Sequence, residues 1–520
     1  MALSTMPALA LPAAFRRTAA RYAEQPAIGY GNDDYLAFAE VDQASDRIAA
    51  GLAKQGLLPG ERLALYAPNG PDFCLAYLGI VKTGAVVVPI NVMLSAPEID
   101  YILRDAGVRG LCYDTVFSET VTALEAVAAG TMFTVEFGGE TWQRWLDNSA
   151  ALPPTPGIEP AADLAVLLYT SGTTGHPKGA MLSHANLYAN TVSCMAALQL
   201  QPGHDRVLTV LPMFHAFAAT VGMLLPLLHG LTLVTLPRFE PEAVSRAVGQ
   251  FRCTVLPAVP SMFNVLLRLP AHVDAQLASL RFCISGGAAM PQALLQRFEE
   301  RFGIPILEGD GPTECGPVTS VNPVDGERKV GSIGLPIPAV EMRILDEQGA
   351  VLPVNTVGEI CVRGPNVMRG YWHQPEATAA AFAGDWFRTG DLGYVDEAGY
   401  FYIVDRKKDL IIVNGMNVYP RAVEEALYRD QRVAECAVVG EPDSRHGEIV
   451  VAHIVPASDT SLDAEAVRTH CRQYLGRHEI PKRIHIRESL PKNAAGKLLK
   501  RALRKAGEVE RGVDLSADAQ

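Results

Sequence analysis

Short runs of β-forming residues alternate with helical patterns along this chain, and the alternation restricts the folds open to it. The runs at 62–66 and 85–89 are rich in branched apolar residues, whereas 38–52 has helical periodicity. This rhythm is typical of parallel sheets covered by helices. A chain of 520 residues is also too long for a single core. The sequence therefore predicts an α/β fold with two or more domains.

The character of the chain changes after residue 404. A charged run, Asp405–Asp409, follows a strand-like segment, and beyond it short strands alternate with short helices. We expect a large N-terminal domain of several subdomains over residues 1–405, a hinge near 406–408, and a small mobile α+β domain over 409–520. The proline-rich segment 152–156 predicts a joint between subdomains of the larger domain.

Composition argues against several classes of partner. The formal net charge is -12 and no long basic run is present, so electrostatics do not favour nucleic acid. The most apolar stretch, 220–236, is interrupted by Pro226, His229 and Gly230 and is shorter than the roughly 20 residues that span a bilayer. Nine cysteines without a C-x-x-C pair indicate reduced thiols. We therefore expect a cytoplasmic protein without an integral membrane segment.

A loop rich in hydroxyls and glycines follows the buried apolar run at 164–169. It extends from Thr170 to Gly179 with the sequence T-S-G-T-T-G-H-P-K-G. Glycines allow backbone N–H groups to approach phosphate oxygens, hydroxyls donate further bonds, and Lys178 offsets charge. Pro177 and Gly179 flank the lysine, which excludes a Walker loop. Taken alone, the alternative interpretation of this loop is a surface turn rich in Gly, Ser and Thr.

The loop is similar to the phosphate loop of the adenylate-forming superfamily, which contains acyl-CoA synthetases, luciferases and the adenylation domains of peptide synthetases. The superfamily pattern Y-T-S-G-T-T-G-x-P-K-G is matched in full. Further matches follow in the superfamily's order and cover nearly the whole chain: residues 211–215, 285–288, 311–314, 370–372, 386–391, 405–409, 414–420 and 491–497. The chain most resembles the medium- and long-chain fatty acid–CoA ligases.

The resemblance implies a site for ATP and AMP. Its expected residues are Thr170, Ser171, Gly172, Thr173, Thr174, Lys178, Gly287, Ala288, Asp310, Gly311, Thr313, Asp391 and Arg406. Asp391 resembles the aspartate that accepts both ribose hydroxyls, and Arg406 the arginine that also reaches the ribose. Glu314, together with Thr170, is expected to hold Mg²⁺ through hard oxygen atoms.

The resemblance also implies a reaction in two halves. Lys497 is expected to lie between the carboxylate and the α-phosphate, where loss of such a cation typically lowers the rate by ~10²–10³. The smaller domain would then rotate about Lys408, bringing Gly415 to the coenzyme A arm. His215 would stand near the entrance for the acyl group and the thiol.

Each of these residues has a simpler interpretation when taken alone. Glu314 would be a solvated carboxylate, Asp391 a turn or cap residue, Arg406 a surface ion pair, and His215 a core histidine. Asp310 also departs from the superfamily, where an aromatic residue commonly stacks on adenine. An aspartate cannot stack, so it either accepts a bond from the adenine amino group or leaves the base less tightly held.

The acid substrate is less well specified than the reaction. Small residues at 216–222, and the resemblance of 259–267 to fatty-acyl members, favour a medium- or long-chain fatty acid over acetate. An aryl acid is the alternative substrate, and a packed helix is the alternative role of the small residues. Coenzyme A is the expected acceptor, with a carrier protein as the alternative. A binding-only role is disfavoured because Lys497 and Glu314 are both present. The oligomeric state is not specified.

Overall fold

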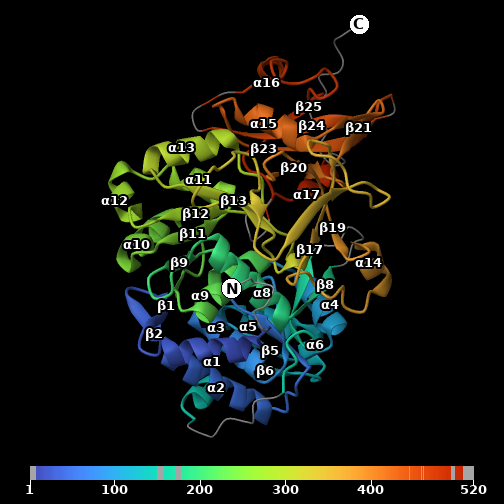
Figure 1. Ribbon diagram of the computed structural model, residues 1–520. Coiled ribbons are helices and arrows are strands. Elements are labelled where there is room, and N and C mark those ends of the chain that lie inside the picture. Colours follow the sequence, from blue (N-terminus) through green and yellow to red (C-terminus); the bar gives the residue numbers. More distant parts are fainter. Residues whose placement is uncertain are drawn as a thin grey trace.

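The computed structural model describes residues 8–148, 157–170, 177–443, 445–457, 460, 462–492 and 498–506. The predicted joint at 152–156, most of the predicted phosphate loop and Lys497 therefore lie outside the described residues. Figure 1 shows a large body of layered helices and strands with the smaller C-terminal domain above it. The α/β fold with a large N-terminal and a small C-terminal domain is confirmed.

A six-stranded sheet has the order β6-β5-β3-β4-β7-β8, in which the first five strands are parallel and the last is antiparallel. Its strands are β3 (Arg62–Tyr66), β4 (Val86–Pro89), β5 (Val108–Tyr113), β6 (Phe133–Glu136), β7 (Leu164–Thr170) and β8 (Lys178–Ser183). The accompanying helices are α2 (Phe38–Lys54), α3 (Pro71–Lys82), α4 (Ala96–Ala106), η2 (Thr115–Phe117), α5 (Ser118–Ala123), α6 (Glu125–Ala128) and α7 (Glu140–Leu146).

A nine-stranded sheet has the order β15-β14-β13-β12-β11-β9-β10-β1-β2. Its strands are β1 (Pro26–Tyr30), β2 (Asp34–Ala37), β9 (Arg206–Thr209), β10 (Thr232–Thr235), β11 (Val255–Ala258), β12 (Phe282–Ser285), β13 (Ile306–Asp310), β14 (Ser320–Val321) and β15 (Leu335–Pro336). The helices of this part are α1 (Leu11–Arg21), α8 (His184–Ala197), the π-helix η3 (Ala218–Leu224), α9 (Leu225–His229), α10 (Pro241–Phe251), α11 (Pro260–Leu266), η4 (Ala271–Val273), α12 (Asp274–Leu277), α13 (Gln292–Phe302) and η5 (Thr313–Cys315).

Two five-stranded sheets complete the fold. The first contains β16 (Glu341–Leu345), β17 (Gly358–Arg363), β18 (Phe382–Ala383), β19 (Trp386–Val395) and β20 (Phe401–Arg406), with α14 (Pro375–Ala380) beside it. The second belongs to the smaller domain and contains β21 (Ile411–Val413), β22 (Met416–Val418), β23 (Val433–Asp443), β24 (Gly447–Pro456) and β25 (Arg483–Ile486). Helices α15 (Pro420–Tyr428), α16 (Ala464–Cys471) and α17 (Lys500–Ala506) accompany it.

Helix α3 shows how the larger domain is packed. All of its residues from Phe73 to Lys82 are buried, so the helix is enclosed on all sides. The ammonium group of Lys82 lies 2.6 Å from Asp42 and 2.7 Å from Asp46, both on α2. Because a buried cation is costly without partners, this double ion pair is what allows a lysine at that position.

Arg421 joins the smaller domain to the larger one. Its backbone N–H donates to Asp405 at 2.9 Å, and its guanidinium donates to the carbonyl of Ile403 at 2.6 Å. The same guanidinium lies 3.9 Å from Glu308 on β13. Burial raises the pKa of Glu308 to about 7, although Arg421 opposes the shift. The three contacts fix one orientation of α15 relative to β13 and β20.

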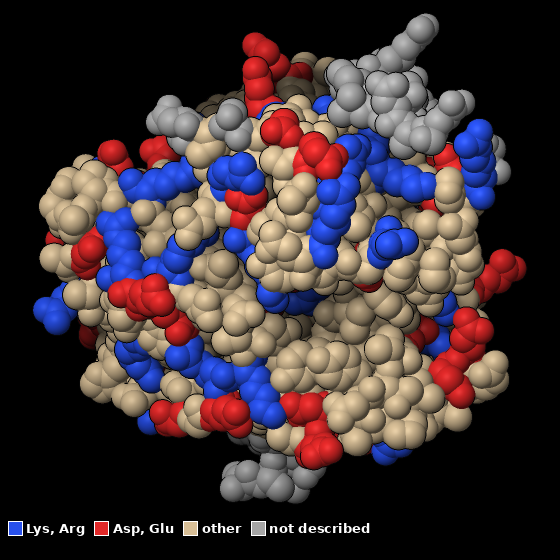
Figure 2. Space-filling view, turned by 90° about the horizontal axis from the view of Figure 1, so that it is seen from above, with Lys and Arg blue, Asp and Glu red and all other residues tan. Residues whose placement is uncertain are grey.

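The surface carries mixed charge on the face seen in Figure 2, where Lys and Arg side chains are interspersed with Asp and Glu. Within the described part of the chain, no helix combines the length and apolar character needed to cross a membrane.

Candidate active site

The ends of the predicted phosphate loop lie side by side. Strands β7 and β8 form an antiparallel pair in which Thr170 is the partner of Lys178. Residues 171–176, which include Ser171, Gly172, Thr173 and Thr174, lie outside the described residues. The ammonium group of Lys178 lies 5.2 Å from the centre of the Tyr371 ring, within the range of a cation–π contact.

Glu314 is placed by a sharp turn after β13. A side chain at Gly311 would come within 1.8 Å of the carbonyl oxygen of Pro317, so this position admits only glycine. The Tyr371 hydroxyl donates to Oε1 of Glu314 at 2.8 Å, and the backbone N–H of Met368 donates to the Glu314 carbonyl at 2.7 Å. Burial, followed by the Glu314 charge, raises the pKa of Tyr371, so its hydroxyl stays protonated and serves as a donor.

Asp391 and Arg406 meet across two strands. They are register partners on β19 and β20, and Oδ1 of the aspartate lies 3.1 Å from Nε of the arginine. Asp391 raises the pKa of Arg406 most strongly, with further contributions from Asp310 and Glu314. The arginine thus lies within the field of three carboxylates that the sequence had assigned to one site.

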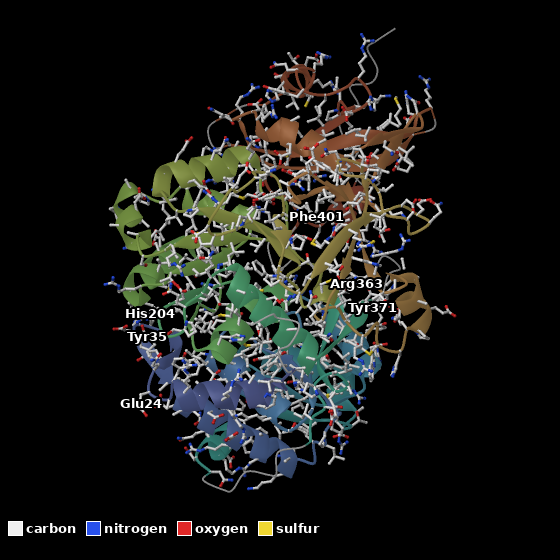
Figure 3. The ribbon with its side chains drawn as sticks, viewed as in Figure 1. Glu24, Tyr35, His204, Arg363, Tyr371 and Phe401 are labelled. Atoms are coloured by element: carbon white, nitrogen blue, oxygen red, sulfur yellow. The ribbon has the colours of Figure 1, made fainter. Side chains whose placement is uncertain are left out.

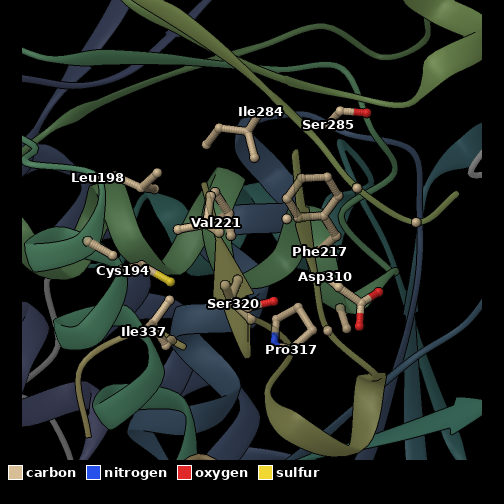
Figure 4. Close-up of a pocket in the computed structure, with 18 of the residues that line it drawn as sticks. Cys194, Leu198, Phe217, Val221, Ile284, Ser285, Asp310, Pro317, Ser320 and Ile337 are labelled. Atoms are coloured by element: carbon tan, nitrogen blue, oxygen red, sulfur yellow. The ribbon is translucent and has the colours of Figure 1, made fainter. Parts of the chain in front are cut away.

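A cavity that is partly open to solvent lies beside the turn that carries Asp310, Gly311 and Thr313. His215, Gly287, Asp310, Gly311 and Thr313 line one part of it, so five predicted site residues share this cavity. The remainder of the lining is mainly apolar and includes Cys194, Ala197, Leu198, Val221, Val318, Val321 and Ile337 (Figure 4).

Other predicted residues lie outside the cavity lining. Ala288 is exposed, as are Lys408 and Gly415. Gly415 has a φ of +77°, which a glycine tolerates, in the turn between β21 and β22, and a side chain there would meet open space. The structure places Lys408 two residues beyond the end of β20, and its predicted role as the hinge stays a prediction.

The residues that follow His215 fall into two groups according to where their side chains pack. Ala216, Phe217 and Val221 line the cavity, whereas Ala218 packs into the core beside α10 and α11. A side chain at Gly222 would come within 2.6 Å of Thr209, so this glycine permits close packing against β9. Helix α11, within the segment 259–267, also packs into that core.

The described donors suit Mg²⁺ held mainly by a bound nucleotide. Among the described residues, no group of three or more His, Cys, Asp or Glu side chains could hold a metal ion. Glu314 offers a carboxylate, with Oε2 not engaged by Tyr371, and Thr170 offers a hydroxyl. Magnesium usually takes one or two carboxylates and completes its octahedron with water and phosphate oxygens. Such a sparse protein contribution is therefore compatible with Mg²⁺.

Comparison with known families decides the membership of this chain. The family described as AMP-binding enzyme matches residues 15–372, and the family of the AMP-binding enzyme C-terminal domain matches residues 422–497. The chain belongs to the AMP-binding enzyme family. The predicted membership of the adenylate-forming superfamily is thus confirmed.

Individual relatives agree in their class of reaction. The chain is 36% identical over 519 residues to a long-chain-fatty-acid–CoA ligase of Bacillus subtilis, covering 94% of this chain and 92% of the relative. It is 39% identical over 479 residues to a feruloyl-CoA synthase of Amycolatopsis sp., covering 92% of this chain and 94% of the relative. This AMP-binding enzyme is an acid–thiol ligase that uses ATP, coenzyme A and a small carboxylic acid.

Solved structures extend the comparison to the fold. An anthranilate CoA ligase in complex with anthranoyl-AMP superposes with a TM-score of 0.91 at 27% identity, covering 97% of this chain and 99% of that one. ATP-bound MatB from Rhodopseudomonas palustris superposes with a TM-score of 0.88 at 32% identity, covering 96% of this chain and 99% of that one.

Motif matching did not identify every residue of the site. The apolar cavity wall formed by Cys194, Leu198 and Ile337 carries no local signal, since these are ordinary core residue types. Tyr371 stood within a matched segment, G-Y-W, yet its contact with Glu314 links positions 57 residues apart. A hydroxyl-bearing aromatic in an otherwise apolar motif is the one signal that could have drawn attention to it.

Proposed function

We propose that this acyl-CoA synthetase activates a medium- or long-chain fatty acid. A carboxylate oxygen of the acid attacks the α-phosphorus of ATP, forming an acyl-adenylate as pyrophosphate leaves. The coenzyme A thiol then attacks the acyl carbonyl, forming a thioester as AMP leaves. The observation that carries the substrate class is the largely apolar cavity that adjoins the proposed nucleotide residues.

The apolar lining of the cavity supports an alkyl chain. Its wall includes Cys194 and Leu198, which are buried, and also Ala197 and Val318, which are partly exposed. The apolar lining thus extends from the interior to partly exposed positions, so a long alkyl chain would bury CH₂ groups at about 0.8 kcal/mol each along the way. The long-chain-fatty-acid–CoA ligase relative supports the same class.

An aryl acid is the second candidate substrate. The feruloyl-CoA synthase relative and the similarity to an anthranilate CoA ligase favour it. An aromatic ring would require width near Phe217 and Val221 rather than length toward Ala197. The two substrate classes therefore depend on different parts of the cavity wall.

The proposed roles of the individual residues are those that the resemblance to the adenylate-forming superfamily implies. Asp391 and Arg406 bind the ribose, while Thr313 and the phosphate loop with Lys178 bind phosphate oxygens. Glu314 and Thr170 would hold Mg²⁺, which would neutralise phosphate charge when bound. Lys497 stabilises the charge that develops in adenylation, and His215 gates the entrance. Rotation about Lys408 brings Gly415 to the coenzyme A arm. The free thiols favour a cytoplasmic location.

Two neighbouring alanines on α8 provide a matched test of the substrate class. Ala197 lines the cavity and Ala196 is exposed, so Ala197→Trp narrows the cavity whereas Ala196→Trp serves as the control. Release of pyrophosphate and AMP is followed with saturated acids of increasing length and with hydroxycinnamates, with and without coenzyme A. We expect kcat/KM of Ala197→Trp to fall about 10-fold or more for long acids only.

Each result assigns a different function. If hydroxycinnamates alone release pyrophosphate and Ala197→Trp has no effect, the aryl-acid alternative replaces the fatty acid. If acids release pyrophosphate but coenzyme A never accelerates AMP release, the acceptor is a carrier protein. Lys497→Ala should lose adenylation while still forming thioester from supplied acyl-adenylate, and equal loss of both half-reactions contradicts its assignment.

A further inference from the structure

We propose that Tyr371 is a positioning residue that aims the Glu314 carboxylate and keeps Lys178 and Glu314 apart until Mg²⁺ and ATP bind between them. This inference rests on the proposed roles of Glu314 and Lys178. Tyr371 lies in the segment before α14, where Figure 3 labels it. Its backbone, its hydroxyl and its ring each make a contact that supports the assignment.

The backbone around Tyr371 extends the pairing of β8. The N–H of Arg369 donates to Met181, the N–H of Met181 donates to Gly370, and the N–H of Trp372 donates to Gly179, at 2.8–2.9 Å. An antiparallel bridge pairs Ala180 with Tyr371 itself. Since β8 begins at Lys178, this ladder fixes Tyr371 relative to the strand that carries the proposed phosphate-binding lysine.

The hydroxyl of Tyr371 fixes one oxygen of Glu314. It donates to Oε1 at 2.8 Å and leaves Oε2 without a bond to Tyr371. A hydrogen bond to a charged acceptor is stronger than one between neutral groups. The hydroxyl therefore selects one rotamer of Glu314 before any ligand is present, which lowers the entropy lost when a cation binds.

The side chain of Tyr371 is in contact with both charges. Lys178 lies 5.2 Å from the ring centre, and Glu314 binds the hydroxyl at the other end of the same side chain. Lys178 and Glu314, both within the described residues, form no ion pair with each other. A direct ion pair would occupy the lysine and the carboxylate that Mg²⁺ and the phosphates need. The tyrosine side chain thus holds two opposite charges near each other without letting them neutralise.

The test separates the hydroxyl from the ring. Tyr371→Phe removes the hydrogen bond to Glu314, while Tyr371→Leu also removes the ring. Tyr400→Phe is a matched control, because the Tyr400 hydroxyl donates to the carbonyl of Glu327 and Lys329 lies 4.7 Å from its ring, at a position without a proposed role. ATP binding is measured by calorimetry as Mg²⁺ is varied, and the unfolding temperature is measured without ligand.

We expect Tyr371→Phe to raise the Mg²⁺ concentration for half-maximal ATP binding by about 10-fold, with the KM of the acid unchanged. Tyr371→Leu should raise it further. In a Glu314→Gln background the Tyr371→Phe change should add less than about 2-fold, because the two residues act as a unit. Tyr400→Phe should match the wild type, and the unfolding temperatures of Tyr371→Phe and Tyr400→Phe should agree.

Three contrary results are distinguishable. If Glu314→Gln alters the Mg²⁺ dependence but Tyr371→Phe does not, or if the two changes are additive, Tyr371 is not a positioning residue while the proposed role of Glu314 stands. If Glu314→Gln leaves the Mg²⁺ dependence unchanged, the proposed metal site itself is wrong. A large fall in the unfolding temperature of Tyr371→Phe relative to Tyr400→Phe would show a structural role instead.

Discussion

Asp391 and Arg406 face each other from adjacent antiparallel strands, with the carboxylate Oδ1 3.1 Å from the guanidinium Nε. Asp391 is almost completely buried, whereas Arg406 is about two-fifths exposed, so the pair has one anchored and one accessible member.

Removing the carboxylate of this pair should weaken nucleotide binding. We expect Asp391→Ala to reduce the affinity for AMP and ATP by about 10-fold or more, because the ribose loses an acceptor and Arg406 loses its main partner. Isothermal titration with AMP measures the change. Glu341→Ala is the control, since its ion pair with Arg363 lies exposed on the same sheet. An equal effect in both variants would rule out a specific ribose contact.

Lys82 should contribute strongly to stability. Lys82→Met leaves Asp42 and Asp46 without their buried partner, and breaking a buried ion pair typically costs about 3–5 kcal/mol. Because both aspartates are partly exposed, we expect the lower part of that range and a clear fall in unfolding temperature by calorimetry. Arg104→Ala, whose pair with Glu125 is exposed, should change little. Adding Asp42→Asn to Lys82→Met should restore part of the loss.

His184 should make the protein less stable in acid. Burial lowers the pKa of His184 from 6.5 to about 4, while its Nδ1 accepts the N–H of Leu11. Between pH 6.5 and pH 4, His184 therefore binds a proton in the unfolded chain but not in the folded chain. The stability associated with His184 is fully present above pH 6.5 and is lost as the pH falls toward 4.

The variant His184→Gln isolates this contribution, because glutamine does not titrate. When the pH falls from 7.5 to 5, the unfolding free energy of the wild type should fall by about 2 kcal/mol more than that of the variant. The difference between the two unfolding free energies at each pH measures this effect. His204→Gln changes an exposed histidine and should keep the wild-type dependence. Identical pH dependence in His184→Gln and the wild type would refute the assignment.

The cysteines should be chemically silent in the folded protein. All nine are free and buried, and burial raises the pKa of Cys112, Cys194, Cys253 and Cys361 to about 12. The thiolate is the reactive form, so a thiol reagent at neutral pH should label almost none of them within minutes. In denaturant the reagent should count nine thiols. Rapid labelling of the native protein would show that the folded chain opens at one of these positions.

Local patterns predicted local structure well. The apolar run at 62–66 is β3, which is buried on both faces, and the helical pattern at 38–52 lies within α2. Both were predictable because apolar runs and apolar helical spacing are local properties of the sequence. The order of the strands could not be predicted in this way. Strand β1 pairs in parallel with β10, about two hundred residues away in the sequence, and no local property of either strand specifies that partner.

For the candidate site too, motifs predicted the polar residues, whereas the packing of the apolar cavity wall was not predictable from local sequence. Motif matching assigned Asp310, Glu314, Asp391 and Arg406 to one site, and the influence of the three carboxylates on the pKa of Arg406 agrees with that assignment. The cavity wall was predicted only in part, since Ala218 packs into the core whereas the nearby Val221 lines the cavity. Which small or apolar side chain faces a cavity depends on the π-helical phase of η3, which periodicity at 3.6 residues does not describe.

The three contacts of Arg421 also determine how the two domains would separate. They radiate from one residue to Asp405, Ile403 and Glu308, so turning the smaller domain about residues 406–408 would break them together rather than in succession. A partial turn that breaks one of these contacts would break all three. The smaller domain would therefore change orientation in an all-or-none step. The two half-reactions would then take place in two distinct conformations, without stable intermediate orientations of the domain.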